Sequence, residues 1–235
     1  SEMCIRDRVL VLSSPHNPGG RVWTKDELKG IASFADRHDL ILVSDEIHND
    51  LVMPNYKHIP MALAAPEVED RLIMMTSSTK TFNLAGMHTG NVIIPNETLR
   101  EKFNKTMVSY GISPNSFGKH MVAAAYCQEG ADWVDALMIY IAENQRIFNS
   151  SMNSIPGVNS MELEGTYLCW VDFSNTGMQN EEVLNRVEKV AQIAISRGAT
   201  FGTGGETFLR FNVATQRALI FDALERLKRA FADLQ

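Results

Sequence analysis

The sequence predicts an α/β protein built on a mostly parallel sheet, followed by a smaller α+β part at the C-terminus. In the first part, short apolar runs alternate with helical patterns, as in sheets whose parallel strands are joined by helices. Polar side chains follow three of those runs directly, at the strand ends where open α/β sheets bind their ligands. After Pro156 and Gly157 the chain changes to strand, helix, strand and helix.

The first part of the chain is expected to supply the parallel sheet. Thr24 and Glu27 have the spacing of a capping box, which predicts that a helix begins there. We expect strands at 9–12, 40–43, 72–75 and 91–95, and helices at 24–35, 98–110, 114–128 and 132–152. Short apolar strands of this kind belong to sheets that are buried on both faces.

The C-terminal part has a different pattern. Apolar runs at 167–173 and 208–213 predict two strands, and residues 181–197 predict a helix that Gly198 ends. The last helix carries four apolar residues at helical spacing, namely Ile220, Leu224, Leu227 and Phe231. We therefore expect a large-domain portion at residues 1–145 and a small C-terminal domain at residues 146–235.

Composition argues against several classes of protein. The chain has 235 residues, 45% of them hydrophobic, and a net charge of -6, which fits a globular protein and disfavours a nucleic-acid partner. No apolar run is long enough to span a bilayer, so we expect no membrane association. Cys4, Cys127 and Cys169 form no paired motif, so neither a disulfide framework nor a metal site is expected. A reducing cytoplasm is the expected compartment.

An Asn, an Asp and a Lys each follow a predicted strand, in the order Asn17, Asp45 and Lys80. This set matches the needs of pyridoxal 5′-phosphate (PLP). The cofactor is held through an amine that can lose its proton, which lysine supplies. A carboxylate such as Asp45 favours a protonated pyridine nitrogen, and the Asn17 amide can donate to the ring oxygen. The set predicts a PLP site at the carboxyl ends of the strands.

Ser77 and His48 extend this candidate site. Ser77 lies three residues before Lys80 and offers a hydroxyl to the cofactor phosphate. His48 lies one helical turn after Asp45 and can project to the same side, although a packing role is the alternative. Taken singly, Lys80 could be a solvated residue, Asp45 a strand end and Asn17 part of a turn. Their order along the chain favours the site.

Arg210 is the candidate for substrate recognition. It lies in a predicted strand between Leu209 and Phe211, so its charge must be paired or must reach a cleft. Arginine matches the α-carboxylate of an amino acid with two parallel hydrogen bonds. A salt bridge within the small domain is the alternative.

The segments PHNPGGRVW, SDEIHNDL and SSTKTFNLAG resemble the class I/II aminotransferase superfamily of PLP enzymes. His16 and His48 stand where ordinary members have other residues, and this variant is similar to the MalY/PatB-type branch of cystathionine β-lyases, or C–S lyases. The resemblance runs from Val9 to the C-terminus. It implies fold type I, with a PLP-dependent transferase-like large-domain portion and an α+β small domain.

The resemblance also implies roles for the candidate residues. Lys80 would hold PLP and remove the Cα proton, Asp45 would pair with the pyridine nitrogen, and Arg210 would bind the substrate carboxylate. The remaining cofactor contacts would come from Asn17, His48 and Ser77. His88 departs from the superfamily, which usually has a phosphate-binding arginine there, and this weakens the inferred phosphate site.

Residues 1–8 show no structural pattern and resemble translated adaptor sequence rather than protein. The family places a substantial segment before the strand at 9–12, including the aromatic that stacks on the cofactor. We therefore expect an N-terminally truncated chain that alone binds PLP poorly. The resemblance further implies a homodimer with the active site at its interface.

Three functions remain open from the sequence. The favoured one is a PLP-dependent carbon–sulfur β-lyase acting on a small amino-acid substrate, L-cystathionine or a related cysteine S-conjugate, to give a thiol, pyruvate and ammonia. The second is an aminotransferase for a neutral or aromatic amino acid. The third is a PLP-binding regulatory protein. The histidines at positions 16 and 48 favour the lyase.

Overall fold

The computed structural model describes residues 8–234, so residues 1–7 of the segment expected to be non-native lie outside the described residues. The chain forms two compact units. The first comprises the described residues up to His16 and Val22–Ala136, and the second comprises Asn17–Arg21 and residues 137–234. Among residues 8–234, no helix combines the length and the apolar character needed to cross a membrane.

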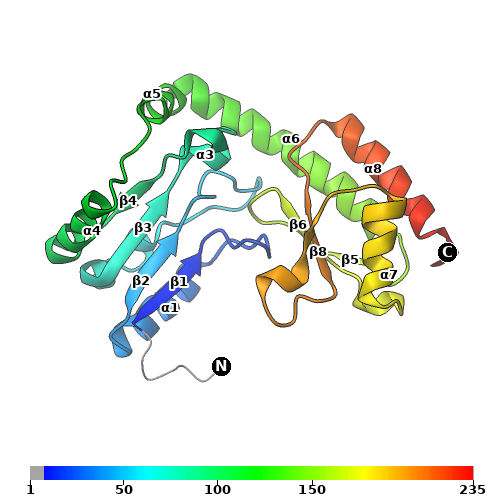
Figure 1. Cartoon of the computed structure of the whole chain (residues 1–235), viewed down its shortest axis with the longest axis horizontal. Helices are drawn as coiled ribbons and strands as arrows, with labels where there is room; N and C mark the ends of the chain where they lie inside the picture. Colours follow the sequence, from blue (N-terminus) through cyan, green and yellow to red (C-terminus); the bar gives the residue numbers. More distant parts are fainter. Residues whose placement is uncertain (1–7, 235) are drawn as a thin grey trace. The chain divides into compact units, whose positions relative to one another are not determined.

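The described part of the first unit is built on a sheet in the order β1-β2-β3-β4 (Figure 1). Its strands are β1 (Val9–Ser13), β2 (Ile41–Asp45), β3 (Leu72–Thr76) and β4 (Asn91–Ile93). The first three pair in parallel, and β4 runs antiparallel to β3. The predicted mostly parallel sheet is confirmed, and the parallel pairing brings the carboxyl ends of β1, β2 and β3 to one edge.

Helical segments lie between these strands and after them along the chain. They are α1 (Lys25–Arg37), α2 (Met61–Ala64), η1 (Pro66–Arg71), α3 (Ser78–Thr81), η2 (Ala85–Met87), α4 (Glu97–Ser109), α5 (Ser116–Ala125) and α6 (Gln128–Met152). The capping box at the start of α1 is confirmed, because the Thr24 hydroxyl accepts from the Glu27 N–H and the Glu27 carboxylate accepts from the Thr24 N–H. Leu28 of α1 belongs to the same buried cluster as Leu42 and Leu72 of the sheet.

The prediction that the sheet is buried on both faces is wrong for part of the described chain. Leu10 and Leu12 of β1 pack on the α1 side, but Val9 and Val11 on the opposite face are 52% and 66% exposed. Successive side chains of a strand point to opposite faces, so a continuous apolar run does not by itself require that both faces are covered.

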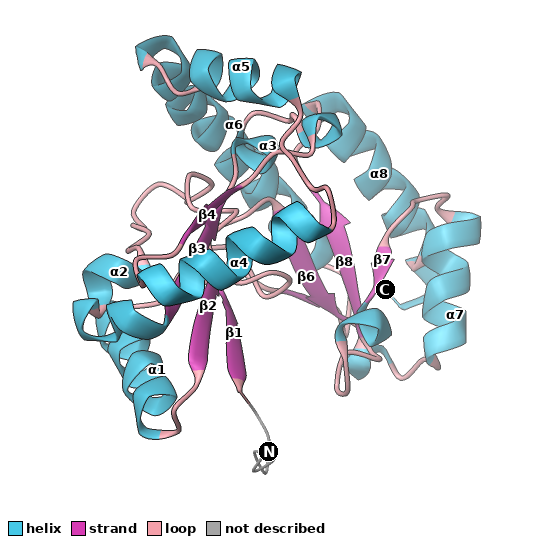
Figure 2. Cartoon of the chain, turned by 60° about the vertical axis from the view of Figure 1, so that its left-hand side comes forward, coloured by secondary structure: helices cyan, strands magenta, loops and turns pink. Residues whose placement is uncertain are grey.

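The second unit contains an antiparallel sheet in the order β5-β6-β8-β7, and β6, β8 and β7 lie side by side in Figure 2. The strands are β5 (Asn159–Ser160), β6 (Leu168–Asp172), β7 (Ser196–Arg197) and β8 (Phe208–Asn212). The helical segments after α6 are η3 (Ser174–Thr176), α7 (Asn180–Leu184), η4 (Asn185–Val190), η5 (Gly198–Phe201), α8 (Arg217–Ala230) and η6 (Ala232–Leu234). This α+β arrangement is the one that the sequence predicted.

The helix predicted at 181–197 ends earlier than expected. It runs through α7 and the π-helical turn η4, and Gln192 then takes a left-handed conformation with φ 54°. Ser196 and Arg197 pair instead with Arg210 and Leu209 of β8. The apolar spacing could not reveal this, because strand pairing with a distant segment replaces the helical hydrogen bonds of these residues.

Candidate active site

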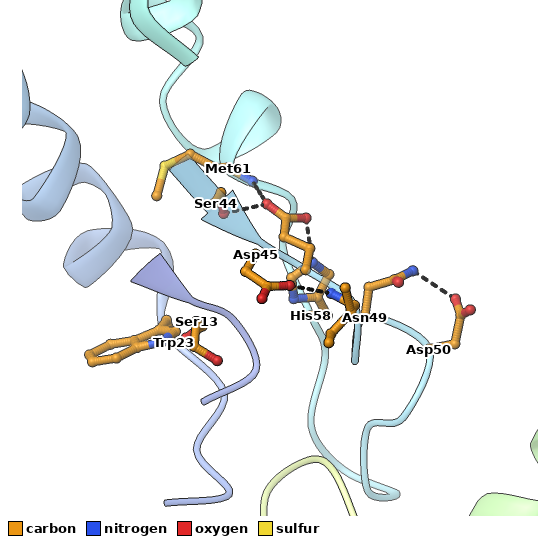
Figure 3. Close-up of polar contacts among 10 residues, drawn as sticks. Ser13, Trp23, Ser44, Asp45, Asn49, Asp50, His58 and Met61 are labelled. Carbon is orange, nitrogen blue, oxygen red and sulfur yellow. Dashed lines mark hydrogen bonds and ion pairs between the residues drawn. The ribbon is translucent and has the colours of Figure 1, made fainter. Parts of the chain in front are cut away.

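Asp45 is the last residue of β2 and is half-buried at the carboxyl edge of the sheet. Its Oδ1 atom accepts a hydrogen bond from the Ile47 N–H at 3.2 Å (Figure 3). Burial raises the pKa of this carboxyl above its ordinary 3.8, and the charge of Glu46 acts in the same direction. The Ile47 N–H and the positive charge of Lys80 oppose this rise. The structure therefore brings Asp45 and Lys80 within electrostatic reach of each other.

Lys80 lies on α3, the single helical turn that follows β3. The turn forms because the Ser77 hydroxyl caps it, accepting from the Thr79 N–H at 3.1 Å. The same hydroxyl donates to the Thr89 carbonyl at 2.7 Å. Ser77 is thus buried at the start of the turn that carries Lys80. Its contact with a phosphate stays a prediction.

Asp50, which the sequence analysis missed, accepts several hydrogen bonds, one of them from Thr81, the residue after Lys80. Its Oδ2 accepts from the Thr81 hydroxyl at 3.0 Å and from the Tyr126 hydroxyl at 3.2 Å, and its Oδ1 accepts from the Asn49 amide at 2.8 Å. Burial, together with the Asp50 charge and hydrogen bond, raises the pKa of Tyr126 to about 12. Asp50 thus connects the turn after β2 to the helix that carries Lys80.

Glu46 and His58 form a second group that the sequence analysis missed. His58 is not a surface residue, because its side chain is only 8% exposed and its Nε2 atom lies 2.8 Å from Glu46 Oε2. Glu46 Oε1 accepts from the Ser44 hydroxyl and the Met61 N–H, as the dashed lines in Figure 3 show. No local signal in the sequence marked His58, since its partner lies twelve residues away.

Two further histidines take different positions. His48, a predicted cofactor contact, lies in the turn after β2 and is 3% exposed, and its backbone carbonyl accepts from the Leu51 N–H. His88 is exposed and follows η2 in a left-handed conformation with φ 45°. The cofactor role of His48 stays a prediction.

The second unit brings Asn17 and Arg210 together. Both side chains are half-buried, and Arg210 donates to Asn17 Oδ1 at 2.8 Å and to the Ser196 hydroxyl at 2.9 Å. The guanidinium also lies over the Phe201 ring, 4.7 Å from its centroid. Burial lowers the pKa of Arg210. Asn17 and Ser196 are neutral, so these contacts do not support the alternative in which Arg210 forms a salt bridge.

These arrangements fit PLP. Burial raises the pKa of Asp45 and so disfavours its ionised form. A further cation would stabilise that form, and the protonated pyridine nitrogen of PLP is such a cation. Lys80 provides a half-buried primary amine on the turn that follows the neighbouring strand β3. Arg210 uses two of its five N–H donors in the described contacts, so it retains donors for a carboxylate. In residues 8–234, no group of three His, Cys, Asp or Glu side chains is arranged to hold a metal ion.

Comparison with known proteins agrees with these features. Residues 2–227 match the model of the family "Aminotransferase class I and II". The chain is 33% identical to cystathionine beta-lyase PatB of Bacillus subtilis, over 95% of this chain and 58% of that protein. It is also 33% identical to protein MalY of Escherichia coli, over 90% of this chain and 54% of that protein. The chain thus spans little more than half the length of these relatives.

A solved structure shares the fold as well. The structure is similar to cystalysin of Treponema denticola, whose crystal structure contains a pyridoxal 5′-phosphate cofactor, with a TM-score of 0.91 and 38% identity. The match covers 97% of this chain and 58% of that one. The fold is therefore the predicted one of the PLP-dependent fold type I proteins. The chain belongs to the aminotransferase class I and II family.

Proposed function

We propose that this protein is a PLP-dependent carbon–sulfur β-lyase that cleaves L-cystathionine or a related cysteine S-conjugate. Water is consumed, and the products are a thiol, pyruvate and ammonia. The observation that carries the proposal is that Asp45 ends β2 and Lys80 lies on the helical turn after the neighbouring parallel strand β3, so both belong to the carboxyl edge of the sheet. Two comparisons support a PLP-dependent lyase. PatB is named a cystathionine beta-lyase, and the crystal structure of cystalysin contains PLP.

Each residue of the proposed site has a separate task. Bound PLP supplies an electron-accepting ring that makes the Cα proton of the substrate acidic. Lys80 accepts that proton on its Nζ atom as general base. Asp45 holds a proton at the ring nitrogen. Ser77 is assigned to the phosphate, to which its single O–H group would donate in place of the Thr89 carbonyl. These residues all lie in the first unit, where α3 and the end of β2 hold them.

In the second unit, Arg210 binds the α-carboxylate of the substrate through its remaining N–H donors. Asn17 accepts from Arg210 through Oδ1, and its amide group is proposed as the donor to the ring oxygen of PLP. His48 is proposed as a further cofactor contact. We also propose that the protein is a cytoplasmic homodimer with a large domain ending near residue 145.

An aminotransferase is the second candidate, because the matching family model bears that name. The two functions share Lys80, Asp45 and Arg210 and differ in the fate of the substrate. A lyase expels a thiolate from Cβ, whereas an aminotransferase passes the amino group to a keto acid. The naming of PatB as a cystathionine beta-lyase favours the first.

The test is an assay of the full-length protein, loaded with PLP, on L-cystathionine. We expect pyruvate and free thiol to be released in equal amounts without an added keto acid, and Lys80→Ala to abolish both. Lys119→Ala, on the exposed surface of α5, is the matched control and should retain activity. Turnover only in the presence of a keto acid would refute the lyase and establish the aminotransferase.

A further inference from the structure

Glu46 is a buried carboxylate beside the proposed cofactor partner Asp45. It is 1% exposed and receives three hydrogen bonds, from the Ser44 hydroxyl at 2.8 Å, the Met61 N–H at 2.9 Å and His58 Nε2 at 2.8 Å. A buried charge of this kind persists only where donors compensate its lost hydration. The three donors supply that compensation.

His58 is the donor whose role depends on its chemical state. An ionised carboxylate can only accept hydrogen bonds, so we assign the donor role in this contact to Nε2 of His58. Ser44 and Met61 both address Oε1 of Glu46, while His58 alone among the described contacts addresses Oε2. Loss of the imidazole would leave a buried carboxylate oxygen without its donor, which is costly.

The Glu46–His58 bond closes the loop that runs from the end of β2 to the start of α2. Glu46 begins this loop, and its carboxylate holds the other end of the loop through His58 and, three residues later, through the Met61 N–H. The Glu46 N–H in turn donates to the Met75 carbonyl of β3 at 2.7 Å. Glu46 therefore fixes the loop to the sheet edge on which Asp45 lies.

The closed loop carries side chains of the proposed site. Asp50 lies within it and accepts from the Thr81 hydroxyl, one residue after Lys80. His48 also lies within it and is buried. A chain of contacts thus runs from His58 through Glu46 to Asp45, and from the loop through Asp50 to the helix of Lys80.

We propose that His58, acting through Glu46, is a positioning residue: it closes loop 46–61 and so holds Asp45 and Lys80 in their working arrangement. The effect on catalysis rests on the proposed function, whereas the closure of the loop does not. His58 itself touches none of the residues assigned to the cofactor or substrate in the described contacts.

The first test measures amide hydrogen exchange of the full-length protein without PLP. In His58→Leu, which removes the donor, amides of the loop should exchange about ten- to a hundredfold faster, as expected when a hydrogen bond to a buried charge is lost. His58→Gln keeps an N–H donor and should restore most of the protection. His120→Leu, on the exposed face of α5, is the control and should leave the loop unchanged.

If His58→Leu fails to fold, His58→Asn takes its place, because asparagine is polar but shorter than histidine. Faster exchange confined to the loop supports the proposal. Unchanged exchange there overturns it, and so does equally faster exchange throughout the first unit, which would show only a loss of global stability.

The second test examines the PLP-loaded protein. We expect His58→Leu to lower kcat about tenfold or more and to change the visible spectrum of bound PLP, with KM for the amino acid nearly unchanged. His58→Gln should restore both. A loosened loop with wild-type kcat and spectrum would refute the positioning role. A wild-type protein that binds no PLP would instead refute the proposed function, and the exchange result would still decide whether His58 closes the loop.

Discussion

Arg210→Lys tests the substrate-binding role most directly, because it keeps the positive charge and changes only its geometry. The Arg210 guanidinium donates to Asn17 and Ser196 at 2.8 and 2.9 Å and lies 4.7 Å from the centre of the Phe201 ring. A lysine ammonium is a point charge without the planar fork. It cannot keep both contacts and also offer two parallel N–H groups to a carboxylate.

The magnitude follows from those contacts. Because the charge is kept, the substitution removes one of two parallel hydrogen bonds to the carboxylate, and a hydrogen bond to a charged group contributes about 1.5–3 kcal/mol. At about 1.4 kcal/mol for each tenfold change, this corresponds to a rise in KM of roughly tenfold to a hundredfold. The stability of the second unit should fall by only about 1 kcal/mol, because the lost internal hydrogen bonds are to the neutral acceptors Asn17 and Ser196.

The assay is steady-state kinetics of the full-length protein with L-cystathionine, together with equilibrium binding of PLP and thermal unfolding. We expect KM to rise strongly, kcat to change less and PLP affinity to stay near the wild-type value. Arg229→Lys, exposed on α8, serves as the matched control. A wild-type KM in Arg210→Lys, or a loss of PLP binding equal to the loss of substrate binding, would refute the reasoning.

Three further predictions concern the first unit. Lys80→Ala should remove the covalent attachment of PLP, and borohydride fixation followed by peptide mapping checks this; fixation at another lysine would exclude Lys80. Asp45→Asn should stabilise the protein without PLP at neutral pH, because the raised pKa shows that the folded state disfavours the charged carboxyl. That gain should shrink as the pH falls through the raised pKa towards 3.8, where the wild-type carboxyl is protonated too. Thermal unfolding against pH measures it, with the exposed Asp70→Asn as control, and parallel curves for Asp45→Asn and the wild type would contradict it. Asp50→Asn should lower the pKa of Tyr126 from about 12 while burial keeps it above 10.0, which titration of the tyrosinate absorbance tests; an unchanged titration would rule out the contact.

Most of the fold could be predicted from the sequence because its signals are local. The capping box of Thr24 and Glu27 lies within one turn and marks the start of α1 correctly. The apolar runs before Asp45 and Lys80 locate β2 and β3 to within two residues at either end. The helix predicted at 181–197 was wrong at its C-terminal end, because β7 is specified by β8 rather than by its own residues.

The candidate residues could be predicted because each follows a strand or lies within one, and a residue's position in a strand depends mainly on the chain around it. The sequence by itself thus determined the order of strands and helices, the carboxyl edge that carries Asp45 and the turn that carries Lys80.

Only the tertiary structure decided which side chains meet. Arg210 and Asn17 are 193 residues apart, and His58 and Glu46 are twelve apart in a segment without helical or strand periodicity. Such contacts depend on how distant segments pack, and a charged side chain forms them because burial removes its water and makes a hydrogen-bond partner in the protein necessary. No pattern of spacing in the chain records that requirement.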